Sequence, residues 1–240
     1  MPQFLLDSTV PCERPRIACT QPRRVAATSL ASRVAEEVGV HLGGLVGYTV
    51  RFDDRTTDRK TRLTYLTDGS LLANMLADRD LNNLDVVILD EAHERALRTD
   101  LLIGFLKQIQ ARRKERVKAW RKSGGKDEPA PTELKIVVMS ATLDAERFSS
   151  FYGDAPILFV EGRQHPVAIM HAEQAPTDFI DGVTKTVYDI HTRLPDGDIL
   201  VFLPGQEDIE GAAASIRSYE PDLPAWGRAH GRKVKQVRSI

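Results

Sequence analysis

The segment Val86–His93, with the sequence Val-Val-Ile-Leu-Asp-Glu-Ala-His, limits most strongly what this chain can fold into. Four consecutive aliphatic residues without polar alternation are typical of a strand buried on both faces of a parallel α/β sheet. Ligands bind such sheets beyond the carboxyl ends of the strands, where Asp90 and Glu91 follow. One carboxylate can hold Mg²⁺ together with substrate phosphates, and its neighbour can take a proton from an attacking water. The segment therefore indicates hydrolysis of a nucleoside triphosphate.

A helix cap is the alternative interpretation of the same two acids. Acidic side chains near a helix N-terminus accept hydrogen bonds from its unpaired N–H groups and complement the helix dipole. Asp90 and Glu91 alone do not distinguish a helix cap from a catalytic pair. Other segments of the chain are needed to choose between these two interpretations.

Three other apolar runs also end in polar residues. Ile17–Cys19 leads into Thr-Gln-Pro-Arg-Arg, Leu63–Leu66 leads into Thr-Asp-Gly, and Ile136–Met139 leads into Ser-Ala-Thr. Each junction alone is weak evidence, because hydroxyl groups after a strand are commonly helix caps and an Arg-Arg pair commonly lies in solvent. Together, the repeated junctions predict the rim of one crevice.

Taken in order, six segments closely resemble the DEAH-box RNA helicases of superfamily 2. They are Thr20–Ala27, Val46–Asp54, Leu66–Leu72, Asp90–Arg95, Met139–Leu143 and Leu200–Ile209. Their order and spacing carry the resemblance, which covers roughly residues 1–210. It implies an α/β fold: a RecA-like P-loop NTPase domain with a parallel sheet flanked by helices, and then the start of a second RecA-like domain.

The resemblance also implies roles for the residues that follow two of the apolar runs, Val86–Leu89 and Ile136–Met139. Asp90 is expected as the metal-side ligand and Glu91 as the general base, so that both belong to the Mg²⁺ environment. His93 is expected to link the nucleotide state to the facing domain. Ser140 and Thr142 match the motif that couples hydrolysis to movement of the strand.

A second set of residues is expected to contact nucleic acid and nucleotide. Arg23, Arg24, Thr67 and Asp68 match motifs that hold the RNA backbone, and Arg33 matches the arginine that stacks on the nucleotide base. Arginine forks and hydroxyl groups suit phosphate oxygens, and such contacts position a strand without reading its sequence. We therefore expect ATP or another NTP with Mg²⁺ as cofactors, single-stranded RNA or RNA–protein complexes as partners, and a protein activator. The Asp-Glu-Ala-His and Gln-Pro-Arg-Arg motifs disfavour a DNA helicase.

Two departures from the family pattern concern the ends of the chain. The sequence contains no Gly-Lys-Thr or Gly-Lys-Ser, with which the phosphate-binding loop of these enzymes ends. Met1–Asp7 resembles the helix that follows that loop, so we expect the loop upstream, and we expect the arginine-rich motif of the second domain beyond Ile240. The isolated chain is accordingly expected to be catalytically inactive. The alternative is a non-enzymatic short form that binds RNA or a helicase partner.

The domain organisation is expected to have three parts. Residues 1–165 form the first RecA-like domain, 166–225 the start of the second, and 226–240 an irregular basic tail. In the second part, Val167–Met170 and Ile199–Phe202 are expected to be strands. Helical spacing predicts helices over about 24–38, 70–77, 101–109 and 179–191, with Gly39 ending the first.

The tract Lys107–Lys126 contains nine Lys or Arg residues against the single Glu115. We favour a solvated helix end followed by a disordered loop over a dedicated RNA-binding arm.

Composition adds little about partners. The formal net charge is −1, so the prediction of RNA binding depends on local residues and on the resemblance. Two cysteines provide neither a disulfide framework nor a metal quartet. No signal peptide, lipidation motif or membrane-spanning run is recognisable, so no membrane partner is expected. We expect a protein of the nucleus, with the nucleolus as one candidate, or of the cytoplasm, and not a secreted one.

Overall fold

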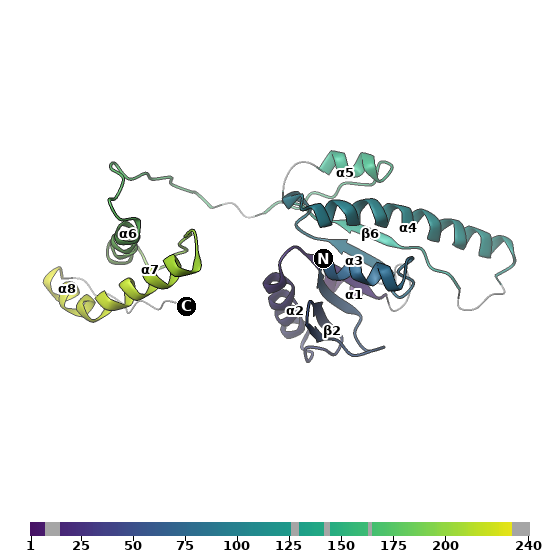
Figure 1. Ribbon diagram of the computed structural model, residues 1–240, viewed down its shortest axis with the longest axis horizontal. Helices are drawn as coiled ribbons and strands as arrows, with labels where there is room; N and C mark the ends of the chain where they lie inside the picture. Colours follow the sequence, from purple (N-terminus) through teal and green to yellow (C-terminus); the bar gives the residue numbers. More distant parts are fainter. Residues whose placement is uncertain (8–14, 126–129, 142–144, 163–164, 232–240) are drawn as a thin grey trace. The chain divides into compact units, whose positions relative to one another are not determined.

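The computed structural model describes residues 1–7, 15–125, 130–141, 145–162 and 165–231 (Figure 1). The chain divides into two compact units, Met1–Glu161 and Gly162–Ile240, and each is described by itself. Within the described ranges, no helix is both long enough and apolar enough to span a bilayer.

The first unit is built on a six-stranded sheet with the strand order β3-β2-β4-β1-β5-β6. The strands are β1 Ile17–Gln21, β2 Val46–Val50, β3 Asp53–Arg55, β4 Leu63–Thr67, β5 Val86–Leu89 and β6 Lys135–Val138. All neighbours are parallel except β2 and β3, which pair antiparallel. The predicted fold class is confirmed: the unit is α/β with a mostly parallel sheet, as in a RecA-like helicase domain.

Helices cover both faces of this sheet (Figure 1). They are α1 Pro2–Leu6, α2 Arg24–Val38, α3 Asp68–Ala77, the short 3-10 helix η1 Ala92–Glu94, α4 Leu97–Lys122 and α5 Ala145–Phe151. Cys19 and Ile88 belong to the apolar cluster that includes α1 and α2 residues. Ala18 and Val87 belong to the cluster with α3 and α4 residues. Successive strand residues thus face opposite layers, which explains the unbroken apolar runs.

Helix α2 has the predicted bounds and ends at a glycine. Gly39 adopts a left-handed conformation with φ 73°, and its N–H bonds back to the carbonyl of Glu36. Glycine adopts this conformation without the strain that a Cβ atom would cause.

The basic tract differs from its prediction. Helix α4 is one helix of 26 residues that continues through the tract to Lys122. Arg113 in its middle is only 2% exposed. Its guanidinium donates hydrogen bonds to the carbonyl oxygens of Thr132, Leu81 and Leu84 at 2.7–2.9 Å. The description of this stretch as a solvated helix end is therefore wrong at Arg113, which ties α4 to the loops before β5 and β6.

The second unit consists of helices in the part that the structure describes. They are α6 Phe179–Arg193, α7 Gln206–Tyr219, the 3-10 helix η2 Glu220–Asp222 and α8 Leu223–Ala229. Helix α6 has the amphipathic character predicted for 179–191, and its Val187 is buried together with Ala212 and Ile216 of α7. The side chain of Asp178 caps α6 by accepting hydrogen bonds from the N–H groups of Ile180 and Asp181.

Two predictions for this unit are wrong. Val167–Met170 and Ile199–Phe202 form no strands, and their apolar side chains are exposed, Phe202 to 86%. An apolar run becomes a buried strand only where neighbouring strands hydrogen-bond to it, and the described residues of this unit offer helices alone. The irregular tail expected from residue 226 is also wrong at its start, because α8 extends to Ala229. Residues 232–240 lie outside the described part.

Candidate active site

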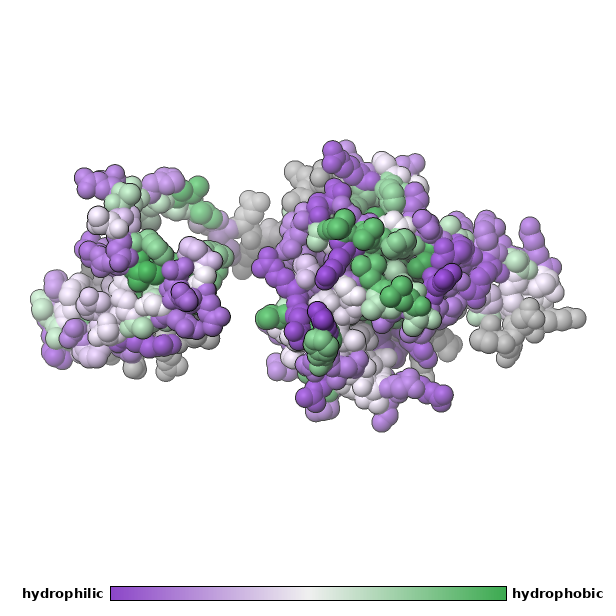
Figure 2. Space-filling view, in the orientation of Figure 1, coloured by the Kyte–Doolittle hydropathy of each residue, from purple (hydrophilic) through white to green (hydrophobic). Residues whose placement is uncertain are grey.

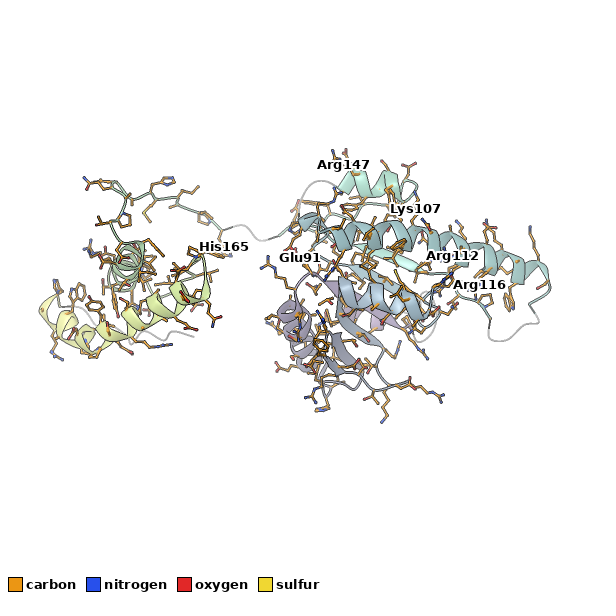
Figure 3. The ribbon with its side chains drawn as sticks, viewed as in Figure 1. Glu91, Lys107, Arg112, Arg116, Arg147 and His165 are labelled. Atoms are coloured by element: carbon orange, nitrogen blue, oxygen red, sulfur yellow. The ribbon has the colours of Figure 1, made fainter. Side chains whose placement is uncertain are left out.

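The polar ends of four strands lie along one edge of the sheet. Register pairs Thr20 of β1 with Leu66 of β4 and with Leu89 of β5, and Leu89 in turn with Val138 of β6. The strands therefore end at the same level, as the sequence predicts. Figure 3 shows Glu91 beside the start of α4, whereas Arg112 and Arg116 lie further along that helix.

Asp90 is fixed through both oxygens of its half-buried carboxylate. Gln21, the last residue of β1, donates from Nε2 to Oδ2 at 2.6 Å. The backbone N–H of Glu91 donates to Oδ1 at 2.9 Å. Both donors are neutral, so the negative charge of Asp90 is oriented and remains available to a cation.

Glu91 occupies a left-handed backbone conformation with φ 54°, at the start of η1. This conformation costs of order 1 kcal/mol for a non-glycine residue, and such strain clusters at functional sites. Its carboxylate is 45% exposed, with Oε2 3.4 Å from Nδ1 of His93. A water-accessible carboxylate next to the oriented carboxylate of Asp90 has the exposure that a general base requires.

His93 joins this loop to the end of β6. The N–H of Ala141 lies 3.3 Å from Nδ1 of His93, and the N–H of Ala92 donates to the carbonyl of Met139 at 3.1 Å. Nδ1 cannot accept from Ala141 and donate to Glu91 at once. A backbone N–H can only donate, so Nδ1 accepts the hydrogen bond from Ala141 in this arrangement. Ser140 lies between Met139 and Ala141, within this junction, whereas Thr142 lies outside the described residues.

The residues expected to bind RNA begin at the ends of β1 and β4. Arg23 stands just before α2, its side chain 78% exposed, and its guanidinium lies 3.4 Å from the carboxylate of Glu94. Arg24 is the first residue of α2 and is exposed. The hydroxyl of Thr67 caps α3 by accepting a hydrogen bond from the N–H of Ser70 at 3.3 Å. Both arginines are exposed at this edge of the sheet.

Asp68 is a correction, because its side chain is not available to RNA. It is only 4% exposed, and the hydroxyl of Thr99 donates a hydrogen bond to its Oδ2. Its Oδ1 is buried without a hydrogen-bond partner in the described residues. A buried carboxylate cannot contact the RNA backbone, and its charge would repel the phosphates. Asp68 instead joins the start of α3 to the start of α4.

Arg33 does not join the other site residues. It lies more than two turns into α2, and its Nε donates to Oε1 of Glu37 at 2.7 Å. Gln3 donates to the other oxygen of Glu37 at 2.6 Å. These hydrogen bonds lower the pKa of Glu37. The structure therefore places Arg33 on an exposed face of α2 and away from the acids of the strand ends.

Magnesium fits the residues present. Among the described residues, no group of three or more His, Cys, Asp or Glu side chains could hold a metal ion. Mg²⁺ is usually bound by one or two carboxylates with substrate phosphates and waters, so a complete protein cage is not required. Asp90 supplies a carboxylate whose neutral donors leave lone pairs for a cation or its waters.

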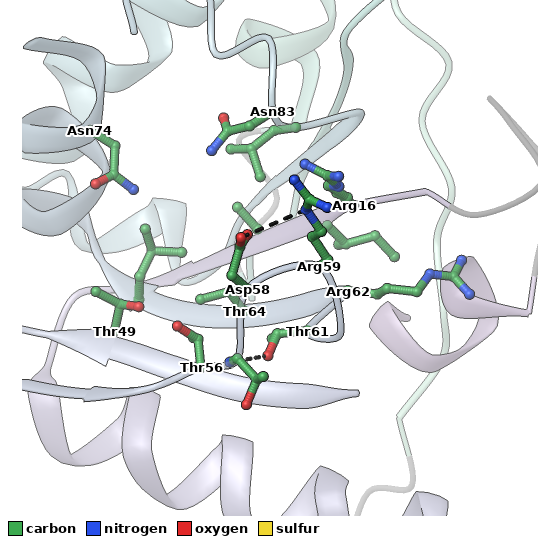
Figure 4. Close-up of a pocket in the computed structure, with 15 residues that line it drawn as sticks. Arg16, Thr49, Thr56, Asp58, Arg59, Thr61, Arg62, Thr64, Asn74 and Asn83 are labelled. Carbon is green, nitrogen blue, oxygen red and sulfur yellow. Dashed lines mark hydrogen bonds and ion pairs between the residues drawn. The ribbon is translucent and has the colours of Figure 1, made fainter. Parts of the chain in front are cut away.

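Two cavities lie away from these strand ends. One of about 210 Å³ lies at the amino ends of β1 and β4, with Arg16, Thr64, Asn74 and Asn83 among its lining residues (Figure 4). The other, of about 560 Å³, lies between α3 and α4 and is mainly apolar. Figure 2 shows apolar residues gathered on the surface of the first unit over α3 and α4.

Sequence reasoning missed three residues that contact predicted site residues: Gln21 at Asp90, Glu94 at Arg23 and Thr99 at Asp68. Gln21 and Glu94 belong to the motif segments that carried the resemblance. The sequence of these segments does not show that Gln21 contacts Asp90 or that Glu94 contacts Arg23. Thr99 lies at the start of α4, beyond those segments.

Comparison with known proteins decides the family. Residues 7–150, more than half of the chain, match the DEAD/DEAH box helicase family. The chain belongs to this family. The predicted DEAH-box resemblance is thereby confirmed, and membership implies the use of a nucleotide.

Two relatives within the family are similar over most of the chain. The chain is 45% identical over 225 residues to the ATP-dependent RNA helicase DHX33 of Homo sapiens and to that of Mus musculus. Each alignment covers 93% of this chain and 30% of the relative. The chain thus spans under a third of the length of these relatives.

Proposed function

We propose that the protein is an ATP-dependent RNA helicase that remodels RNA or RNA–protein complexes. The arrangement of Asp90, Glu91 and His93 carries this proposal, because it joins an oriented carboxylate, an accessible base and a link to the next strand end. The family match and the relatives named ATP-dependent RNA helicases support it.

The two acids have separate roles in the proposed hydrolysis. Asp90 would hold Mg²⁺, directly or through its waters, and the bound cation would neutralise phosphate charge. Glu91 would accept the proton of the attacking water, since its carboxylate is half exposed and close to Asp90. The ring of His93, which accepts a hydrogen bond from the N–H of Ala141, would couple this loop to the motif that begins at Ser140.

Arg23 and Arg24 would bind the phosphates of single-stranded RNA at the same edge of the sheet, with the capped Thr67 at the neighbouring strand end. Such contacts position a strand without selecting its sequence, and they weaken with salt. Substrate choice would then come from other regions or from a protein activator. We further propose that this chain alone hydrolyses no ATP, because its sequence contains no Gly-Lys-Thr or Gly-Lys-Ser.

A strand-displacement assay tests the proposed function. The full-length protein that carries this chain is mixed with an RNA duplex bearing a single-stranded tail, with ATP and with a non-hydrolysable analogue. We expect strand separation with ATP only, and less with a DNA duplex of the same sequence. Separation that is equal for DNA, or that does not need ATP hydrolysis, would contradict the proposal.

A further inference from the structure

Gln21 is a buried polar residue in the strand next to the DEAH strand. It is the last residue of β1 and is 2% exposed. Thr20 pairs in register with Leu89, so the following residues, Gln21 and Asp90, lie side by side. A buried side-chain amide is costly unless its hydrogen-bonding groups find partners. Gln21 meets that requirement by donating to Asp90 Oδ2 at 2.6 Å.

We infer that Gln21 is a positioning residue for the metal-side carboxylate of Asp90. This inference rests on the proposed function, because it assumes that Asp90 holds the cation. Gln21 fixes one oxygen and the N–H of Glu91 fixes the other, so the carboxylate plane has one orientation. Groups that orient a metal ligand commonly change metal affinity ten- to a hundred-fold when they are removed.

A neutral donor suits this position better than a charged one. An arginine or lysine at this position would pair with the carboxylate of Asp90 and compete with the cation for its charge. Arg95 forms such a pair elsewhere, where it donates two hydrogen bonds to Asp100 at 2.9 Å. The amide of Gln21 orients the carboxylate and leaves its full negative charge.

A second titratable side chain, a cysteine, lies on the same strand as Gln21. Cys19, two residues before Gln21 on the same strand, is 1% exposed. Burial, with a smaller effect from the charge of Asp90, raises the pKa of the Cys19 thiol to about 12. The thiol therefore stays neutral at physiological pH and adds no charge beside Asp90.

Mn²⁺ binding to the 240-residue chain tests the inference without measuring activity. Mn²⁺ substitutes for Mg²⁺ and broadens NMR signals of nearby nuclei, so a titration gives its affinity at Asp90. We expect Gln21→Met, which keeps the length but removes the donor, to weaken Mn²⁺ binding about tenfold. Circular dichroism checks that the variant keeps its fold.

A matched control is available at Gln3. Its amide also donates to a carboxylate at 2.6 Å, that of Glu37, away from Asp90. Gln3→Met should therefore bind Mn²⁺ like the unmodified chain. If Gln21→Met also binds like the unmodified chain while Asp90→Asn loses the ion, the positioning role is wrong and the role of Asp90 survives. If Asp90→Asn binds Mn²⁺ as well as the unmodified chain does, both the metal role of Asp90 and the inference fail.

A second measurement does not depend on the folding of a Gln21 variant. The side-chain amide signals of Gln21 are followed in ¹⁵N-labelled chain with and without Asp90→Asn. We expect the Asp90 change to shift these signals and to make their hydrogens exchange at least tenfold faster. Unchanged signals would overturn the inference.

Discussion

The guanidinium of Arg23 and the carboxylate of Glu94 lie 3.4 Å apart and connect the loop after β1 to the loop after β5. Arg23 is the exposed partner of the two, with 78% of its side chain accessible against 36% for Glu94. An RNA phosphate that binds Arg23 must compete with this carboxylate, which lies in the same loop as Asp90 and Glu91. The proposed RNA contact of Arg23 and the loop that carries Asp90 and Glu91 are therefore connected by one ion pair.

Removing the charge of Glu94 should strengthen RNA binding. In Glu94→Gln the competing carboxylate is gone, and we expect single-stranded RNA to bind about two- to fivefold more tightly at low salt, because an exposed pair contributes below about 1 kcal/mol. Fluorescence anisotropy with a labelled oligonucleotide measures the affinity.

Arg23→Gln gives the opposite test. We expect weaker RNA binding and a slope of log K against log salt that is smaller by about 1, as for the loss of one phosphate contact. Lys118→Gln, which removes a charge paired with Glu115 far along α4, serves as control. Equal losses in Lys118→Gln and Arg23→Gln would show that general charge, and not this contact, determines binding.

Arg113 should contribute strongly to the stability of the first unit. Arg113→Met leaves the carbonyl groups of Leu81, Leu84 and Thr132 without their donor, and we expect a loss of about 3 kcal/mol in the free energy of unfolding. Urea denaturation of the chain measures it. The neighbouring exposed Lys114→Met should change stability by less than about 0.5 kcal/mol. Similar values for both variants would contradict the structural role of Arg113.

The strand ends were predictable because their physical signals are local. Val86–Leu89 shows no polar alternation, which is the pattern of a strand covered on both faces, and Asp90 follows where parallel sheets bind ligands. Gly39 and the helical spacing before it likewise placed the end of α2.

Contacts between distant residues were not predictable. Gln21 and Asp90 are 69 positions apart, and Asp68 and Thr99 are 31 apart, so only the folded register shows that they meet. Arg113 lies in a tract that reads as solvated, since charge patterning does not show which position of a helix faces loops. Ile199–Phe202 has the composition of a core strand, but its residues are exposed. Burial depends on neighbouring strands, which the sequence of this segment does not specify.

Asp78 should make part of the stability depend on pH. Burial of the Asp78 carboxyl raises its pKa. Hydrogen bonds from the N–H groups of Asp80, Asn82 and Asn83 and from the Asn82 side chain together lower the pKa by more, so the net shift is downward. A lowered folded-state pKa gives stability above the unfolded value of about 3.9, which is lost as pH falls through the folded value.

We therefore expect Asp78→Ala to cost about 1 kcal/mol at pH 7, reduced by partial exposure, and the difference from the unmodified chain to shrink below about pH 4. Urea denaturation at several pH values measures this difference. Asp58→Ala, at a 94% exposed side chain, is the control and should show little effect. A cost that stays constant from pH 7 to about pH 2 would mean that the charge of Asp78 is not involved.

ATP hydrolysis in the presence and absence of single-stranded RNA tests the central claim most directly. It is measured on the full-length protein that carries this chain, with Glu91→Gln and with Glu115→Gln as an exposed control. We expect RNA to stimulate hydrolysis, Glu115→Gln to match the unmodified protein, and Glu91→Gln to be slower by about 10²-fold or more while still binding RNA. Hydrolysis that RNA does not stimulate, or that persists unchanged in Glu91→Gln, would contradict the account.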